Sequence, residues 1–191
     1  MLAHGMIGHA WTCPDMIGGG EIGAVGGQQG VDQEFFVRYA QIAALSPMMQ
    51  FSLPPARVLD ARHLAAVHSA LDVRTENLPL ILSLVDEAAL TGEAVVRPMA
   101  FHAPGLDDVT DQYFLGPNLI VAPVTEKAAT HRDVHLPKGQ WQADDGTVHT
   151  GPTRITTCTP LDRIPRFTRV TDAAVTEPPG DQDDARWRPT R

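Results

Sequence analysis

The sequence predicts an α/β segment followed by an all-β segment. Up to about residue 92, short apolar runs alternate with longer stretches in which apolar side chains recur at helical spacing, which is typical of parallel βα units. Beyond residue 95, short alternating runs are separated by glycine, proline and aspartate, which is typical of an antiparallel sandwich or barrel. The chain of 191 residues is long enough for one or two domains with a substantial core.

The composition is that of an ordinary globular protein and argues against several partners. Hydrophobic residues make up 43% of the chain and charged residues 20%, with a formal net charge of -8. This acidic balance argues against nucleic acid and anionic membranes as partners. No segment approaches the apolar length of a membrane span, and the N-terminus lacks the features of a signal peptide. We therefore expect no nucleic-acid partner, no membrane partner and a cytoplasmic location.

Cysteine and histidine spacing indicates neither a metal site nor a disulfide framework. The two cysteines, Cys13 and Cys158, are far apart in the sequence, and the eight histidines show no ligand-like spacing. We expect no metal and no organic cofactor.

The first element is expected to be a buried strand over residues 6–11, followed by the loop Pro14-Asp15-Met16-Ile17-Gly18-Gly19-Gly20-Glu21. Glycines allow a backbone to approach a ligand closely, and a carboxylate can accept hydrogen bonds from hydroxyl groups. One interpretation is therefore a ligand-facing loop around Asp15. The other is a flexible turn whose aspartate only caps the next element.

Two helices and a second strand complete the α/β segment. Asp32 is suited to cap a helix that runs to residue 45, where Ser46-Pro47 ends it. A short strand is expected over residues 48–53. A second helical region spans about residues 60–90, with a break expected before Pro79 and an end at Gly92.

The remaining chain is expected to form a separate β domain and a tail. The expected strands are residues 95–98, 112–114, 118–124, 132–136, 140–143, 147–150 and 154–159. We place the domains at residues 1–94 and 95–170. The polar, proline-rich residues 171–191 lack periodicity, which predicts a disordered tail. Arg97 is expected to pair with nearby acids, and Trp141 to pack in the core rather than stack on a sugar.

A colinear series of motifs resembles glycoside hydrolase family 31, the α-glycosidases, in a branch with bacterial and animal members. The matching stretches are Pro14-Asp15-Met16-Ile17-Gly18-Gly19, Glu34-Phe35-Phe36-Val37-Arg38-Tyr39-Ala40-Gln41, Ser46-Pro47-Met48-Met49-Gln50-Phe51-Ser52, Thr91-Gly92-Glu93-Ala94-Val95-Val96-Arg97-Pro98, Asp111-Gln112-Tyr113-Phe114-Leu115-Gly116, Leu119-Ile120-Val121-Ala122-Pro123-Val124, Leu136-Pro137-Lys138-Gly139-Gln140-Trp141 and Pro160-Leu161-Asp162-Arg163-Ile164-Pro165-Arg166-Phe167.

The resemblance implies a fold and a set of sugar-contacting residues. Residues 1–94 would be the last two βα units of a (β/α)8 TIM barrel, and residues 95–170 the antiparallel β-sandwich domain that follows it. Asp15 would lie beside the sugar-binding subsite at the C-terminal face of the barrel. Gln50 and Ser52 take the places of an arginine and a histidine found in many members, so they are expected to contact the substrate in a site with altered sugar preference.

The resemblance also implies that the catalytic pair lies elsewhere. Retaining glycosidases use two carboxyl groups, and in this family both precede the motif that contains Asp15. Only thirteen residues precede Pro14, so we assign no catalytic residue to this chain and expect a truncated or split family member. Open barrel edges would then invite pairing with the missing barrel portion or self-association.

Two functional hypotheses stay open from the sequence. The first is a fragment of a retaining α-glycosidase that acts on a carbohydrate substrate when the rest of the barrel is supplied. The second is a non-catalytic carbohydrate- or partner-binding module built mainly on the β domain.

Overall fold

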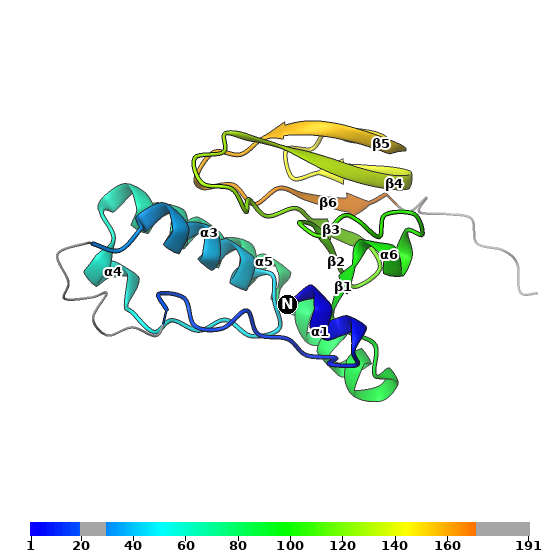
Figure 1. The fold of residues 1–191 in the computed structure, drawn as a ribbon, viewed down its shortest axis with the longest axis horizontal. Coiled ribbons are helices and arrows are strands. Elements are labelled where there is room, and N and C mark those ends of the chain that lie inside the picture. Colours follow the sequence, from blue (N-terminus) through cyan, green and yellow to red (C-terminus); the bar gives the residue numbers. More distant parts are fainter. Residues whose placement is uncertain (20–29, 171–191) are drawn as a thin grey trace, which may run out of the picture.

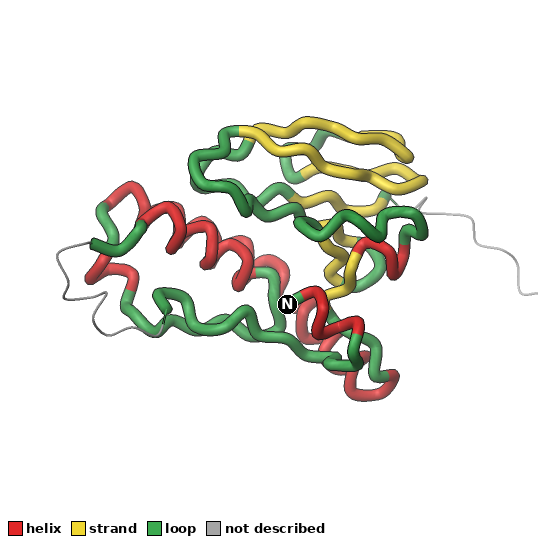
Figure 2. Tube along the Cα trace, in the orientation of Figure 1, coloured by secondary structure: helices red, strands yellow, loops and turns green. Residues whose placement is uncertain are grey.

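The computed structural model describes residues 1–19 and 30–170, which form a helical layer beside a β-sheet (Figure 1). The expected disordered tail and the glycines between residues 20 and 29 lie outside the described residues. Figure 2 shows long loop segments beside the helices, and strands gathered together in another part of the molecule.

Within the described residues, six strands form one antiparallel sheet. Its spatial order is β1-β2-β3-β6-β4-β5. The strands are β1 (Val96–Pro98), β2 (Tyr113–Leu115), β3 (Leu119–Val121), β4 (His131–Ala143), β5 (Val148–Cys158) and β6 (Arg166–Arg169). The predicted antiparallel architecture is confirmed.

Pairing links all six strands into one sheet, and their packing as a sandwich stays a prediction. The sheet buries both faces of its central strands, since Phe114 and Ile120 share an apolar cluster with Val134, Leu136 and Trp141 of β4. Side chains of β4 therefore pack over Phe114 of β2 and Ile120 of β3, which belong to the same sheet. The expected core position of Trp141 is confirmed, because its side chain is fully buried.

Two pairs of strands that were predicted to be separate each form one long strand in the structure. Residues 132–136 and 140–143 belong to β4, and the expected turn between them is a shift in register between Leu136 and Gly139. Residues 147–150 and 154–159 likewise fall largely within β5. At the shift, a side chain on the facing Gly151 would lie 2.1 Å from the carbonyl oxygen of Pro137, so this position requires glycine.

The opposite face of the central strands packs against the helices. Tyr113, Leu115 and Val121 share a cluster with Leu45 at the end of α3 and Leu84 on α5. Neighbouring residues of a strand point to opposite faces, and both faces of β2 and β3 are buried. These two strands therefore have apolar side chains at every position instead of alternating with polar ones.

Helix α3 (Gln33–Ala44) begins as predicted. The side chain of its N-cap Asp32 accepts a hydrogen bond from the backbone N–H of Phe35 at 3.1 Å. Its inner face is buried, including Phe36, Val37 and Ala40. A short helix, α4 (Pro55–Val58), follows the next loop.

Helix α5 (Ala61–Thr91) is continuous, so the predicted break before Pro79 is wrong. Proline removes one helical hydrogen bond, but buried apolar side chains on both sides of it hold the helix against the rest of the molecule. Val67 and Ala70 do so before the proline, and Ile81 and Leu84 after it. The predicted end at Gly92 is confirmed, since this residue adopts a left-handed φ of 77° and its N–H bonds to the carbonyl of Ala88 at 2.9 Å.

The first ninety residues contain no assigned strand among those described. Helix α1 (Leu2–Met6) and a loop replace the strand expected over residues 6–11, and residues 48–53 are also a loop. A strand needs a hydrogen-bonded neighbour along its length. Here the loop that follows residues 6–11 meets residues 48–53 at one isolated parallel bridge, between Ile17 and Phe51.

Candidate functional site

Asp15 lies in an extended loop and adopts an unusual backbone conformation. Its φ is 78°, in the left-handed region that few residues other than glycine occupy. The side chain is exposed, and its Oδ1 accepts a 2.7 Å hydrogen bond from the N–H of Met16. This bond holds one carboxylate oxygen close to the backbone, while the carboxylate as a whole remains open to solvent.

The parallel bridge brings the loop of Asp15 beside Gln50 and Ser52. The N–H of Ile17 bonds to the carbonyl of Gln50 at 2.9 Å, and the N–H of Ser52 bonds to the carbonyl of Ile17 at 3.0 Å. Ile17 is fully buried between them and anchors the loop. The three residues predicted to contact substrate therefore lie on two adjacent segments.

Ser52 holds the glycine loop. Its Oγ lies 3.1 Å from the carbonyl oxygen of Ile17 and 2.9 Å from that of Gly19, and donates to these acceptors. Gly18 must be a glycine here, because it has a φ of 106° and an added Cβ would lie 2.9 Å from Ser52 Oγ. The hydroxyl group is thus committed to the loop's own backbone.

Gln50 has a different environment. Its side chain is exposed, and its Nε2 lies 3.7 Å from the Sγ of Cys13 on the neighbouring segment. Cys13 is a free thiol. The amide of Gln50 thus crosses between the two segments and keeps polar atoms available at the surface.

Tyr39 of α3 is a neighbour that the sequence did not identify. Its hydroxyl group donates a hydrogen bond to the carbonyl of Pro14, next to Asp15. Burial raises the pKa of Tyr39, and the charge of Asp15 raises it further. From the sequence alone, Tyr39 was only one residue of the stretch Glu34 to Gln41. The motif around Pro14 and Asp15 does not predict the contact with Tyr39, which lies 25 positions from Pro14.

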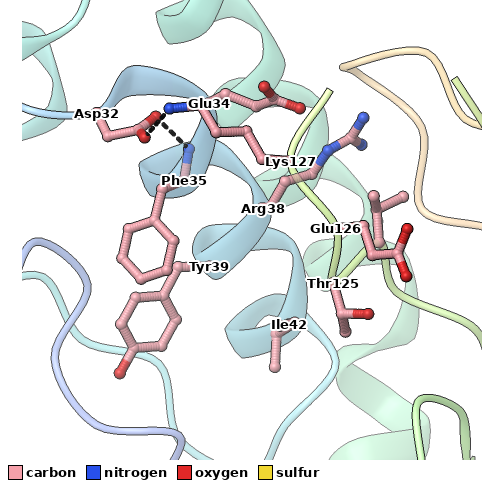
Figure 3. Close-up of a pocket in the computed structure, with 10 residues that line it drawn as sticks. Asp32, Glu34, Phe35, Arg38, Tyr39, Ile42, Thr125, Glu126 and Lys127 are labelled. Atoms are coloured by element: carbon pink, nitrogen blue, oxygen red, sulfur yellow. Dashed lines mark hydrogen bonds and ion pairs between the residues drawn. The ribbon is translucent and has the colours of Figure 1, made fainter. Parts of the chain in front are cut away.

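The aromatic ring of Tyr39 also lines a cavity of about 360 Å³ on the outer face of α3. Figure 3 shows Phe35 and Tyr39 side by side on this face, with Thr125 and Glu126 across from them. Phe35 is 64% exposed. At the rim, Lys127 pairs with Asp32, and this hydrogen bond, together with the N–H of Phe35, lowers the pKa of Asp32. The cavity has both apolar and charged lining residues, and Asp15, Gln50 and Ser52 are not among them.

A buried arginine joins the helical layer to the β part. Arg38 is only 7% exposed; its Nη2 bonds to the carbonyl of Thr159 at 2.9 Å and its Nη1 to Oε1 of Gln41 at 3.0 Å. Gln41 in turn donates to the carbonyl of Leu161 at 2.7 Å. Burial lowers the pKa of Arg38. These contacts fix α3, and with it Tyr39, against the segment that precedes β6.

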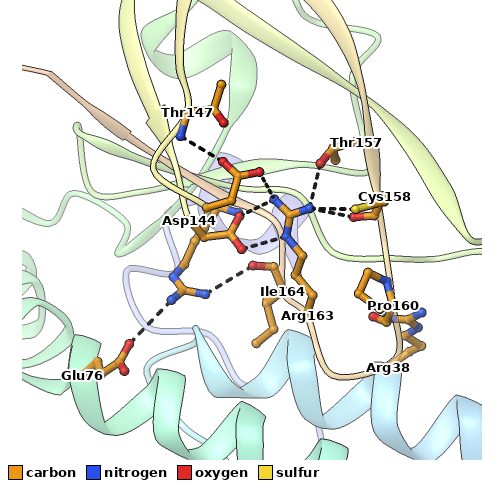
Figure 4. Close-up of polar contacts among 11 residues, drawn as sticks. Arg38, Glu76, Asp144, Thr147, Thr157, Cys158, Pro160, Arg163 and Ile164 are labelled. Atoms are coloured by element: carbon orange, nitrogen blue, oxygen red, sulfur yellow. Dashed lines mark hydrogen bonds and ion pairs between the residues drawn. The ribbon is translucent and has the colours of Figure 1, made fainter.

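The same segment is fixed to the sheet by Arg163 (Figure 4). Its Nε and Nη2 bond to the two carboxylate oxygens of Asp144 at 2.7 and 2.8 Å, and its Nη1 bonds to the carbonyl of Cys158 at 2.9 Å. The paired carboxylate raises the pKa of Arg163. Such bidentate pairs are geometrically specific, so this arginine fixes the hairpin turn beside the sheet.

The described residues hold no group of three or more histidine, cysteine, aspartate or glutamate side chains arranged for a metal ion. Among the helices of residues 1–19 and 30–170, none combines the length and apolarity needed to cross a membrane. Around Asp15, the exposed carboxylate and the exposed amide of Gln50 can form hydrogen bonds with a ligand.

Comparison with known families matches residues 92–171 to the glycosyl hydrolase family 31 C-terminal domain. The chain is 36% identical over 178 residues to the myogenesis-regulating glycosidase of Mus musculus. The aligned region covers 88% of this chain and 25% of the relative. The chain is 30% identical over 177 residues to the sulfoquinovosidase of Agrobacterium fabrum, covering 84% of this chain and 25% of the relative.

A solved structure supports the same relationship. The family 31 sulfoquinovosidase from E. rectale, determined with an aza-sugar inhibitor, aligns with a TM-score of 0.76 and 27% identity, over 88% of this chain and 26% of that chain. The chain spans about a quarter of the length of each of these two curated relatives.

Proposed function

The chain belongs to glycoside hydrolase family 31 and carries the C-terminal domain of that family, and from this premise we propose that it forms the C-terminal part of a retaining α-glycosidase. The whole enzyme would hydrolyse O-glycosyl bonds of a carbohydrate substrate. The two relatives described above and the aligned solved structure are named as glycosidases, which does not favour a dedicated binding module.

We assign residues 1–94 to the last two βα units of a (β/α)8 barrel, residues 95–170 to the β domain and residues 171–191 to a tail. The observation that carries the proposal is the parallel bridge between Ile17 and Phe51. Neighbouring strands of such a barrel run parallel, and α3 and α5 each follow one of these two segments in the sequence. The strands would become complete when pairing partners lie on both sides.

Asp15 is the substrate-binding carboxylate in this proposal. In TIM barrels the active site lies where the strands end, and Asp15 lies in the loop beside the bridge. Its exposed carboxylate can accept hydrogen bonds from sugar hydroxyl groups, and the amide of Gln50 can both donate and accept them. Ser52 would act indirectly, because its hydroxyl group bonds to the backbone of the loop and so helps to position Asp15.

The cleavage chemistry itself requires two further carboxyl groups. In a retaining glycosidase one carboxylate attacks the anomeric carbon, while the other protonates the departing oxygen and later takes a proton from water. We assign neither role to this chain and place both on the preceding part of the barrel. The isolated chain is therefore expected to give no turnover of aryl α-glycosides.

A chimera tests the proposal. This chain would replace the matching quarter of the Agrobacterium fabrum sulfoquinovosidase, and hydrolysis would be measured on that enzyme's substrate and on aryl α-glycosides. We expect activity, with Asp15→Asn lowering kcat/KM about 10- to 100-fold, because a hydrogen bond to a charged group is worth roughly 1.5–3 kcal/mol. Asp107→Asn, a change of the same kind at an exposed loop carboxylate, should leave kcat/KM unchanged.

Two results would contradict the proposal. A chimera that melts cooperatively yet hydrolyses none of these glycosides would contradict the assigned function. Turnover by the isolated chain that disappears in Asp15→Asn would show that the catalytic machinery lies in this chain.

A further inference from the structure

A second cavity, of about 640 Å³, lies between α6 (Met99–His102), β4 and the end of β6. Four of its lining side chains are cationic or able to become so, namely His102, His135, Lys138 and Arg169. No aspartate or glutamate of the described residues lines it. In a chain with a net charge of -8, a cavity lined in this way is a local concentration of positive charge.

Among the residues that the structure describes, the two permanent cations of this cavity have no counter-ion. Within residues 1–19 and 30–170, neither Lys138 nor Arg169 forms a salt bridge. Other arginines of the sheet are paired, as Arg154 is with Asp133 at 2.6 Å. The cavity therefore offers positive charge that no described carboxylate pairs with.

Arg169 is held in place without using a carboxylate. Its guanidinium carbon lies 4.4 Å from the ring centroid of Trp141, a cation–π contact. Trp141 is fully buried and donates from Nε1 to the carbonyl of Pro137 at 2.8 Å, so it is a rigid platform. Gly139 permits the close approach, since a side chain there would lie 3.1 Å from Nη1 of Arg169. A fixed guanidinium loses little freedom when it binds a ligand.

His102 is electrostatically linked to the same group. Burial lowers its pKa most, and the charges of Arg97 and Arg169 lower it further, against the opposing effect of Glu93 and Glu87. Its Nε2 lies 3.1 Å from Nη1 of Arg97, so the neutral ring accepts a hydrogen bond there. Positive charge in the cavity thus disfavours a further proton on His102, and a bound anion would offset that effect.

We propose that this cavity is a binding site for the oxyanion group of a small molecule, namely a phosphate or sulfate group. The guanidinium of Arg169 presents parallel N–H donors suited to a planar pair of oxygens, and Lys138 supplies a second positive charge. The site lies on the β part and shares no lining residue with the segments around Asp15, so it does not depend on the proposed glycosidase function.

The size of the cavity favours a ligand larger than a bare ion. Small-molecule sites commonly enclose roughly 300–1,000 Å³, and this cavity of about 640 Å³ has apolar walls from Leu106 and Leu136 beside its charged groups. A sugar ring that carries a phosphate group would contact both kinds of surface. A free phosphate ion would contact only the charged part.

Titration calorimetry on the full chain, with inorganic phosphate, inorganic sulfate, glucose 6-phosphate and glucose, tests the site. We expect phosphate and sulfate to bind, glucose 6-phosphate to bind more tightly than either, and glucose not to bind. The assigned indole Nε1–H resonance of Trp141 should shift during the same titrations, because Arg169 lies on its ring. Glucose 6-phosphate that binds no more tightly than inorganic phosphate would restrict the site to the free ion and overturn the inference of a larger ligand.

Single substitutions localise the binding. Arg169→Gln should weaken binding about tenfold or more, and Lys138→Gln several-fold, because each removes a charge-assisted contact. Arg154→Gln is the matched control, since it removes one arginine of the same sheet outside the cavity and should change affinity less than about twofold. Equal losses in all three variants would indicate only a general charge effect and would overturn the proposal.

Arg169→Lys guards against loss of folding. It keeps the positive charge on Trp141 but removes the fork of donors, so it should retain the melting temperature and lose most of the affinity that Arg169→Gln loses. Full affinity in a folded Lys138→Gln, Arg169→Lys double variant would show that these residues do not form the site.

Discussion

At the scale of single residues, Gly18 shows how closely the loop beside Asp15 is packed. An added Cβ would lie 2.9 Å from Ser52 Oγ and 3.1 Å from Leu53 Cγ, at a φ of 106°. The neighbouring Gly19 has a φ of 74° but open space around it. A substitution at Gly19 thus meets only the cost of an unusual backbone conformation, whereas one at Gly18 also meets a steric clash.

We predict that Gly18→Ala destabilises the chain more than Gly19→Ala does. Left-handed strain costs about 1–2 kcal/mol at either position, and the clash at residue 18 adds roughly 1–3 kcal/mol. Urea unfolding of the two variants gives the difference directly. Equal losses in the two variants would mean that the contact between Gly18 and Ser52 does not constrain the loop.

At the scale of elements, the unbroken helix α5 carries Pro79 in its interior. An internal proline leaves one carbonyl without its usual donor and costs about 3 kcal/mol relative to alanine in an isolated helix. Packing of the helix on both sides of Pro79 offsets that cost here. The proline thus remains as a local weakness within a well-packed element.

Pro79→Ala is predicted to stabilise the chain by about 1–2 kcal/mol. The gain is smaller than the full propensity difference, because proline also restricts the unfolded chain. Pro55→Ala is the matched control: Pro55 occupies the first turn of α4, where proline suits the helix, so its loss should be neutral or slightly destabilising. Thermal unfolding of both variants is the measurement, and a destabilised Pro79→Ala would contradict this account of α5.

The cap of α3 gives a prediction about pH. The pKa of Asp32 is lowered from 3.8 by its hydrogen bonds to Lys127 and to the N–H of Phe35. A carboxylate with a lowered folded-state pKa contributes stability above its unfolded-state pKa, and this contribution is lost as the pH falls through the folded-state pKa. The stabilisation should thus be complete at pH 7 and absent in strong acid.

We predict that Asp32→Asn costs less than about 1 kcal/mol at pH 7, because asparagine still caps the helix and the lost ion pair is exposed. The difference from the parent chain should shrink below pH 3.8 and then vanish. Urea unfolding across this pH range measures it. Lys127→Gln should cause a similar loss at neutral pH, and the double variant should add little to either single change if the pair acts as one unit.

These elements also indicate what the sequence could and could not predict. The caps at Asp32 and Gly92 were predictable because they depend on a few adjacent residues. The β6 strand, Arg166–Arg169, was missed because its one buried apolar residue, Phe167, is surrounded by polar residues, and only its long-range partners make it a strand. Asp15 was found through a family motif, whereas Tyr39 was not, because its contact with Pro14 spans 25 positions.

At the scale of the whole molecule, one side remains open. The loop segments that meet at Ile17 and Phe51 run beside each other (Figure 2), and several of their large apolar side chains are exposed. Ile7 is 72% and Met48 53% exposed, in contrast to the fully buried Leu45 nearby in the sequence. Polar backbone groups and apolar side chains together on an open edge favour pairing with another chain.

We predict that the purified chain binds 8-anilinonaphthalene-sulfonate and self-associates through this side. Ile7→Glu combined with Met48→Glu should weaken both properties, because two added charges on the open side disfavour apolar contact. Leu90→Glu is the control, since Leu90 is 88% exposed but belongs to α5 and to neither of the two segments. Analytical ultracentrifugation with dye binding gives the readout. A compact monomer that binds no dye would indicate that these segments are complete without further strands, and would count against their assignment to an open barrel.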